Sequence, residues 1–189
     1  MLTFTTLAVL GVDDKTLDNL LLNVAKGDLS AMEELYNQTK TGVYSFALSF
    51  LKNPEDAKDV LHNTYLSIWV SAHMYETVGK PMAWIITIAK NHCYKALRDR
   101  KWKEENEKEN EPATEDFAKD RDIKSTIWQY LNELGDDERR IIVLHAVAGF
   151  KHREIADILN IHLSTELSKY RRGIKKLKNS LISGGAFNE

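Results

Sequence analysis

Apolar positions in the last third of the chain recur at helical spacing and predict two helices joined by a tight turn. Ile155, Ala156, Ile158 and Leu159 lie on one face of the first, shorter helix. Asn160 follows at the expected turn, because asparagine tolerates the left-handed conformation that ends helices. Beyond the turn, apolar residues recur at alternating spacings of four and three, which indicates one long amphipathic helix. They are Leu163, Leu167, Tyr170, Ile174, Leu177 and Leu181.

The face opposite this apolar stripe carries hydroxyls near its start and cations further along. Its residues are Thr165, Ser168, Lys169, Arg172 and Lys176, with Arg171 and Lys175 on the flank. Between residues 164 and 182, six lysines or arginines stand against a single acid, Glu166. A short helix, a turn and a longer basic helix are typical of a helix-turn-helix, whose second helix enters the major groove of DNA. The alternative interpretation is a solvated basic face on a structural helix.

Two or three helices are predicted between Thr16 and Leu51, where Gly27 and Asp28 interrupt the apolar stripe. This stretch offers little candidate chemistry. It is interpreted as structural.

The next helix has a well-defined predicted start. Asn53 is its N-cap, Pro54 its first residue, and Glu55 and Asp56 lie in the first turn, where the helix dipole favours acids. Its inward stripe is Ala57, Val60, Leu61, Thr64 and Ile68. Its outer face carries Asp59, His62, Asn63, Leu66, Trp69 and Val70. Large apolar residues on an outer face indicate either a partner surface or cover by another part of the same domain.

A further helix is predicted from Pro81 to about Trp102, after a polar loop that ends at Lys80. Its buried side is Trp84, Ile85, Ile88 and Ala89. Its other face is basic and carries an aromatic residue: Thr87, Asn91, Tyr94, Arg98 and Lys101, with Lys90, Lys95 and Arg100 beside them. Cations with an interleaved aromatic suit single-stranded or melted nucleic acid. A solvated helix surface would have the same composition.

Charge dominates the segment that follows this helix. Between residues 101 and 122 there are nine acids and five bases, with almost no apolar residue beyond Phe117. Such composition buries too little surface to offset chain entropy, so residues 103–121 are predicted to be a flexible acidic linker. The predicted fold class is all-α, with two small helical domains, residues 1–102 and 122–189. In the second domain a helix is expected to stop near Gly135, and Asp136 and Asp137 are expected to cap the next one.

Composition and charge limit the class of protein but do not indicate a function. The chain has 189 residues, nine glycines, three prolines and a net charge of −2, which fits helical domains with unevenly distributed charge. The single cysteine, Cys93, excludes an internal disulfide and is expected to pack inside a helix. The apolar opening lacks a basic start and a cleavage site, so we expect no signal peptide, no membrane insertion and a cytoplasmic protein.

Three ordered blocks of this sequence resemble the extracytoplasmic-function (ECF) sigma factors. The blocks are NPEDAKDVLHNTYLSIW, PMAWIITIAKNHCYKALRDR, and LNELGDDERRIIVLHAVAGFKHREIADILNIHLSTELSKYRRGIKKLK. The resemblance covers roughly residues 17 to 181 and implies a bacterial transcription initiation factor without cofactor, metal or catalytic residue. Its implied partners are core RNA polymerase, promoter DNA and an anti-sigma factor.

The resemblance also implies roles for individual residues. Core polymerase would contact Asp56, Asp59, His62, Asn63 and Leu66. The minus-10 promoter element would be melted and read by Lys80, Lys90, Asn91, Tyr94 and Arg98. The minus-35 element would be read by Thr165, Ser168, Lys169, Arg172 and Lys176.

Several positions depart from the family pattern. His62 and Asn63 stand where Gln-Glu is usual, and Lys95 replaces an acid. Lys151 replaces a capping serine, a loss of about 1 kcal/mol for that helix. Glu166 replaces an apolar residue, and we expect its carboxylate either to reach water or to lie close to DNA phosphates.

Three other functions are alternatives to this one. An enzyme is disfavoured because Val78-Gly79-Lys80 lacks the upstream glycine of a phosphate-binding loop, no HExxH is present, and the six histidines are scattered. A stand-alone helix-turn-helix regulator would need a sensor or dimerisation domain in the first half. An interaction protein that keeps the sigma shape without initiating transcription is the third alternative.

Overall fold

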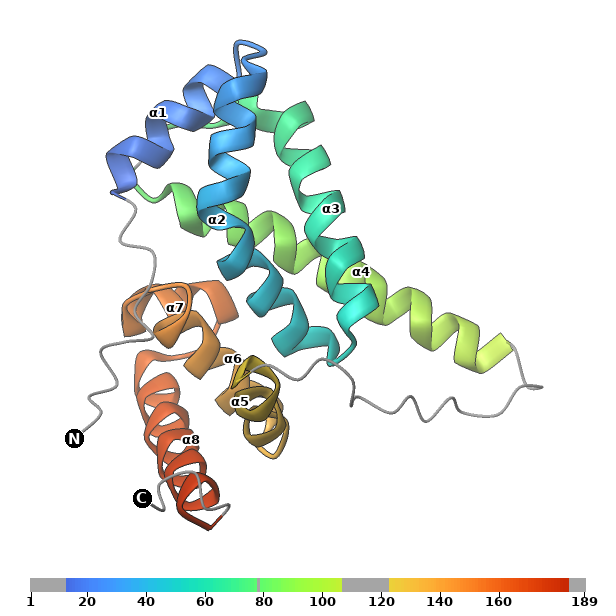
Figure 1. The fold of residues 1–189 in the computed structure, drawn as a ribbon, viewed down its shortest axis with the longest axis vertical. Helices are drawn as coiled ribbons and strands as arrows, with labels where there is room; N and C mark the ends of the chain where they lie inside the picture. Colours follow the sequence, from blue (N-terminus) through green and yellow to red (C-terminus); the bar gives the residue numbers. More distant parts are fainter. Residues whose placement is uncertain (1–12, 78, 107–122, 184–189) are drawn as a thin grey trace.

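The computed structural model describes residues 13–77, 79–106 and 123–183, and within them all regular structure is helical, as predicted (Figure 1). The first group of helices is α1 (Asp14–Val24), α2 (Leu29–Leu51), α3 (Pro54–Ser71) and α4 (Pro81–Asn106), with a short 3₁₀ turn, η2 (Ala72–Met74), after α3. The second group is α5 (Ile123–Asn132), α6 (Asp136–Ala146), α7 (His152–Leu159) and α8 (Leu163–Ser183). None of the described helices is both long and apolar enough to cross a membrane.

Local capping sets where the first helices begin. The Asn53 side chain accepts hydrogen bonds from the backbone N–H groups of Glu55 and Asp56 at 2.8 and 3.0 Å, and Pro54 opens α3. Asp28 caps α2 in the same way after Gly27, whose φ of +85° places it in the left-handed region. The predicted cap at Asn53 and the predicted break at Gly27 are both confirmed.

The core of the first group lies between α1, α2, α3 and α4. Leu21, Leu35, Phe46, Ile68 and Ile85 are fully buried there, one or two from each helix. Burying a large apolar side chain stabilises the fold by about 1.5–3 kcal/mol. This packing orients α3 and α4 so that their polar faces point outward.

Helix α4 continues to Asn106, four residues beyond the predicted end, so the linker prediction was wrong for residues 103–106. Lysine and glutamate are good helix formers, and Lys101 lies 3.6 Å from Glu105 one turn later. Residues 107–122, which carry the rest of the predicted linker, lie outside the described residues. The two domain boundaries therefore stay predictions.

The second group contains the predicted helix-turn-helix, formed by α7 and α8. Asn160 ends α7 in the left-handed conformation, at φ 54° and ψ 50°, as predicted. The prediction that Asp136 and Asp137 cap α6 was wrong by one position. Gly135 is the N-cap residue, and its N–H donates to Glu138 Oε2 at 3.3 Å, while the two aspartates lie in the first turn.

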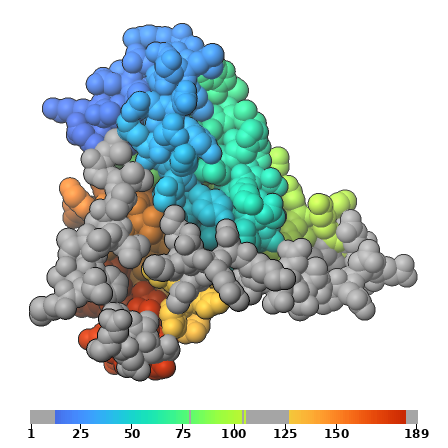
Figure 2. All heavy atoms as spheres, in the orientation of Figure 1, coloured from blue at the N-terminus to red at the C-terminus, as the bar shows by residue number. Residues whose placement is uncertain are grey.

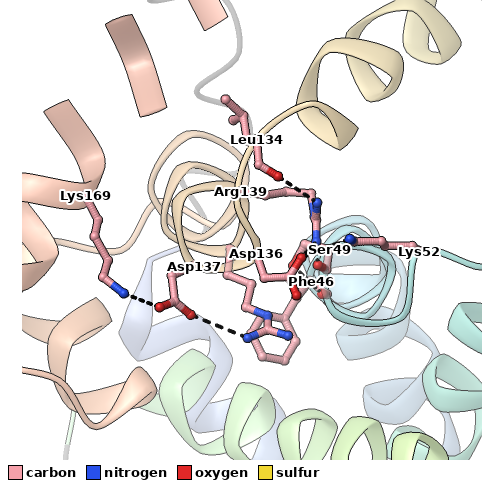
Figure 3. Close-up of polar contacts among 9 residues, drawn as sticks. Phe46, Ser49, Lys52, Leu134, Asp136, Asp137, Arg139 and Lys169 are labelled. Atoms are coloured by element: carbon pink, nitrogen blue, oxygen red, sulfur yellow. Dashed lines mark hydrogen bonds and ion pairs between the residues drawn. The ribbon is translucent and has the colours of Figure 1, made fainter. Parts of the chain in front are cut away.

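The two groups of helices pack against each other, with α6 on α2 and α7 on α4 (Figure 1). Arg139 of α6 is fully buried in this contact and donates from Nε to the backbone oxygen of Ser49 at 2.9 Å (Figure 3). The Arg140 guanidinium lies 3.9 Å from the ring centroid of Phe50. At Gly42, a Cβ atom would lie 3.8 Å from Ala148 Cβ, so the backbones approach closely.

Candidate functional site

The outer face of α3 is exposed as predicted, and it borders an apolar groove between α2 and α3. Leu66 is 52% exposed, and Asp59, His62 and Asn63 are exposed beside it, while Asp56 is half-buried near the helix start. The groove has a volume of about 490 Å³. It is lined by Leu29, Met32 and Tyr36 of α2 and by Lys58, Leu61, His62, Tyr65, Leu66 and Trp69 of α3. Figure 2 shows the surfaces of these two helices side by side.

Sequence reasoning missed the α2 side of this groove. Leu29 is 72% exposed, and Tyr36 is also an exposed aromatic residue. The available signal was weak, because Leu29 and Tyr36 lie off the inward stripe of α2 but single exposed apolar residues are common. Their meaning depends on α3 lying alongside, which periodicity within one helix does not reveal.

Buried polar contacts fix the spacing of the helices that line the groove. Thr39 Oγ1 lies 2.6 Å from Tyr65 OH and donates its own proton to the Leu35 carbonyl, so Tyr65 is the donor between the two hydroxyls. Burial raises the pKa of Tyr65, which keeps the donor protonated. The rings of Tyr36 and Tyr65 meet edge to face, with centroids 4.8 Å apart. These contacts join α2 and α3 beneath the groove.

Four of the five predicted minus-10 residues are exposed. Lys80 lies just before α4, and Asn91, Tyr94 and Arg98 lie along its outer face, with Tyr94 53% exposed. Lys90 is different, because its Nζ donates to the carbonyl of Ile158 at the end of α7, at 2.7 Å. The structure thus leaves four of these residues exposed and ties the fifth to the second group of helices.

Helices α3 and α4 are also joined by a polar contact that the sequence did not reveal. Ser67 Oγ lies 2.8 Å from His92 Nε2. Burial and the charge of Lys95 lower the pKa of His92, which favours the neutral imidazole. The charge of Lys95 therefore acts on a contact between α3 and α4.

The predicted minus-35 residues all lie on α8, but three of them pair with acids of α6. Lys169 bonds to Asp137 (Figure 3), Lys176 Nζ lies 2.8 Å from Glu138 Oε2, and Arg172 Nε lies 3.4 Å from Glu138 Oε1. Thr165 and Ser168 are exposed, as are the flanking Arg171 and Lys175.

Glu138 is ionised at neutral pH in spite of its burial. Burial alone raises the pKa of Glu138, but hydrogen bonds from Lys176 and the Gly135 N–H, with the charges of Lys176 and Arg172, bring that pKa below its usual value. The negative charge that faces the cations of α8 is therefore permanent under ordinary conditions. It pairs with the side chains of Arg172 and Lys176.

The predicted inward stripe of α8 was wrong in its first turn. Leu163 is 37% exposed, whereas Glu166 is fully buried, together with Gly173 and Leu177. At Gly173 a Cβ atom would meet Ile142 Cδ1 at 2.8 Å and Glu138 Cβ at 3.2 Å, so a larger residue there would require these α6 side chains to shift. The expectation that Glu166 reaches water or DNA was also wrong, because its carboxylate bonds to His152 inside the domain.

The start of α7 lacks a side-chain cap, as expected from Lys151. The Glu154 side chain nevertheless accepts a hydrogen bond from the Lys151 backbone N–H at 2.9 Å. This contact is one half of a capping box, since lysine has no acceptor for the other half. Among the described residues, no group of three or more histidine, cysteine, aspartate or glutamate side chains is placed to hold a metal ion.

Two segments of the chain match a known protein family. Residues 35–103 match the family described as Sigma-70 region 2, and residues 124–177 match Sigma-70, region 4. The chain belongs to the sigma-70 family. It is an RNA polymerase sigma factor of the extracytoplasmic-function type, so the stand-alone regulator is not supported.

The chain is similar in sequence to other sigma factors over most of its length. It is 29% identical over 174 residues to the ECF RNA polymerase sigma factor SigK of Mycobacterium sp. (strain KMS), covering 87% of this chain and 90% of that one. It is 28% identical to SigK of Mycobacterium tuberculosis (strain ATCC 25177 / H37Ra), with 87% and 93% coverage.

Two solved sigma-factor structures share the fold. RpoE, in complex with the anti-sigma factor NepR from Bartonella quintana, aligns with a TM-score of 0.63 and 22% identity over 79% of this chain and 95% of that one. CnrH, in complex with the cytosolic domain of CnrY, aligns with a TM-score of 0.64 and 20% identity over 89% and 98%.

Proposed function

We propose that this sigma factor binds core RNA polymerase through the outer face of α3 and the α2–α3 groove. The supporting observation is the exposed Leu66 beside Asp59, His62 and Asn63, at the rim of an apolar groove whose two helices are joined by a buried hydrogen bond. Apolar residues with a polar rim are typical of interface hot spots. Asp56 completes the contact near the start of α3. The protein would act in the cytoplasm, where its polymerase partner is, and an anti-sigma factor would cover the same face.

Promoter contacts are assigned to two helices. Lys80, Asn91, Tyr94 and Arg98 would contact the minus-10 element, with Tyr94 stacking on an unpaired base. Lys90 would join them after leaving the Ile158 carbonyl. Thr165 and Ser168 would approach the minus-35 element through the exposed start of α8, and Lys169, Arg172 and Lys176 would exchange their α6 acids for phosphates.

Titration of the purified chain with core polymerase, followed by run-off transcription, tests the assignment to polymerase. Leu66→Ala should weaken core binding about tenfold, because truncating a central apolar anchor at an interface commonly costs that much. The matched control is Leu22→Ala, since Leu22 is also an exposed leucine but lies on α1 and does not line the groove. Equal binding by both variants would remove the groove from the interface.

The assignment to melted DNA is tested at Tyr94. Tyr94→Ala should lower initiation on duplex promoter about tenfold, because a base stacked on an aromatic ring contributes roughly 1–3 kcal/mol. Tyr94→Phe should keep most of the activity, since it retains the ring. On a template that is already unpaired over the minus-10 element, the loss should become smaller. An equal loss on both templates would argue against a role in melting.

A further inference from the structure

A buried carboxylate connects the two helices of the helix-turn-helix. Glu166 of α8 is fully buried, and its Oε1 lies 2.9 Å from Nδ1 of His152, the first residue of α7. The other oxygen, Oε2, is buried and has no hydrogen-bond partner in the described part of the chain. A carboxylate removed from water is destabilising unless a positive charge compensates it.

One aromatic ring from α6 and one from α8 pack against the His152 ring. The His152 ring stacks on His145 of α6, with centroids 4.6 Å apart and planes at 14°. Tyr170 of α8 meets both imidazoles edge to face, at 4.7 Å from His152 and 5.1 Å from His145. His145 Nδ1 lies 2.9 Å from the Phe150 carbonyl, and because a carbonyl can only accept, that nitrogen carries a proton. The cluster therefore sets the position of α8 against α6 and α7.

His152 is the described side chain best placed to supply the compensating charge. From α6 the facing group is His145, which is engaged with a backbone carbonyl, and from α8 it is Tyr170, whose pKa is raised by burial and by the charge of Glu166. At the start of α7, the charges of Lys151 and Glu154 act on Asp14 of α1. Lys90 of α4 is bonded at the far end of α7.

We infer that His152 and Glu166 are positioning residues for minus-35 recognition: a proton on His152 compensates the buried carboxylate and holds α8 in the orientation that reads DNA. This inference rests on the proposed promoter function of α8. Neither residue needs to touch DNA, since Glu166 lies on the inward side of the helix.

The sign of the pH dependence follows from the charges. Imidazole loses its proton within the physiological pH range. With both ring nitrogens protonated, His152 is positive and the pair with Glu166 is neutral overall. With one proton fewer, His152 can still donate one hydrogen bond, but the charge of the buried carboxylate is uncompensated. Promoter reading by α8 should therefore weaken as the pH rises.

The test measures how much the upstream element contributes to initiation by the full-length chain bound to core polymerase. Initiation is compared on one mapped promoter with its minus-35 element intact or scrambled, between about pH 6 and pH 8. The ratio of the two should fall about tenfold in the wild type, since one uncompensated buried charge is expected to cost at least 1.4 kcal/mol. Glu166→Gln keeps an acceptor for His152 without the charge, so its ratio should stay high and flat with pH.

Matched variants separate positioning from general damage. His152→Phe keeps a stacking ring but leaves Glu166 unpaired, and its ratio should be low at every pH. Combining it with Glu166→Val should restore the ratio. Asp157→Asn is the control, because it removes an exposed carboxylate from α7 outside the cluster. Core binding and initiation without the minus-35 element should be unchanged in all of these proteins.

Two results would overturn the inference. In the first, the wild type and Glu166→Gln both initiate transcription and show the same pH profile of the ratio. This result would leave the proposed function intact. The other concerns the free chain, where the titration of His152 seen by ¹⁵N NMR should coincide with shifts of the α8 amides in the wild type only. If the His152 titration and the α8 shifts do not coincide, the inference fails. Because this measurement does not require initiation, it separates failure of the inference from failure of the proposed function.

Discussion

Arg139 shows how much a single side chain can depend on tertiary partners. In the sequence it stands beside Arg140 in the first turns of a helix, where both resemble solvated cations. In the structure its guanidinium is fully buried and donates to the carbonyls of Ser49 and Leu134 and to Asp136, at 2.9, 3.3 and 2.6 Å (Figure 3). Hydrogen bonds from Lys52 and Arg139 also hold the pKa of Asp136 below its usual value, against the effect of burial.

Replacing Arg139 should therefore destabilise the fold strongly. We expect Arg139→Ala to lower the free energy of unfolding by about 3 kcal/mol, because it leaves buried acceptors without donors. Arg139→Lys should recover little, since one ammonium group cannot reproduce the planar fork. Urea unfolding followed by circular dichroism measures the effect, with the exposed Arg153→Ala as control. A loss as small as that of the control would mean that the buried contacts contribute little.

Cys93 gives a second prediction at the scale of one residue. Burial raises the pKa of its thiol to about 12, whereas an unfolded cysteine titrates near 8.5. The folded state therefore binds the proton more tightly, and stability present below about pH 8.5 should decline as the pH rises above that value. Alkylation by iodoacetamide at pH 8 should be slow in the native protein and fast in urea. Rapid labelling of the native chain would contradict the buried position.

At the scale of the helix, features that depend on neighbouring residues were predictable from the sequence, and features that depend on tertiary contacts were not. The Asn53 cap, the Asn160 turn and the outer face of α3 were predictable because each depends on neighbouring residues or on one period. In α8, two stripes of the same period compete, and they share Tyr170 and Leu177. Because Leu163 is apolar and Glu166 is an acid, the sequence favoured the stripe that begins at Leu163. The burial of Glu166 depends instead on its hydrogen bond with His152, which lies on another helix.

The α8 cations provide the prediction at this scale. Lys169 must leave Asp137 before it can bind phosphate. Asp137→Asn should therefore raise the promoter affinity of the polymerase complex about two- to threefold, because one surface ion pair contributes little free energy. The gain should shrink as salt is added. Glu133→Gln, another exposed acid of the same domain, is the control. An unchanged affinity would show that the pair with Asp137 does not compete with DNA.

At the scale of the whole molecule, the packing of the two helical groups constrains their function. Lys90, a proposed minus-10 contact, is held by the carbonyl of Ile158, and Lys52 of the first group pairs with Asp136 of the second at 3.0 Å. The sequence predicted two domains but contained no sign of this contact, because each of its residues also suits a solvated surface. Promoter binding through Lys90 requires the contact at α7 to open.

A reversible crosslink tests this requirement. The Gly42 and Ala148 Cβ positions would lie 3.8 Å apart, the mean separation in disulfides, if the flexible end of Met82 moves aside. In a Cys93→Ala background, Gly42→Cys/Ala148→Cys should initiate poorly when oxidised and recover when reduced. Each single cysteine variant should be indifferent to reductant. Full activity of the oxidised protein would show that the packed arrangement is compatible with initiation.

The apolar side chains in this contact also have a calorimetric consequence. Ile141, Leu144, Phe150, Ile155 and Ile158 of the second group belong to the same buried cluster as the core of α1 to α4. If the two groups separate when the chain assembles on its enzyme, these side chains become hydrated unless the enzyme covers them. Hydration of apolar surface raises heat capacity. Titration calorimetry at several temperatures would then give a less negative heat-capacity change for the native chain than for one whose groups are already apart.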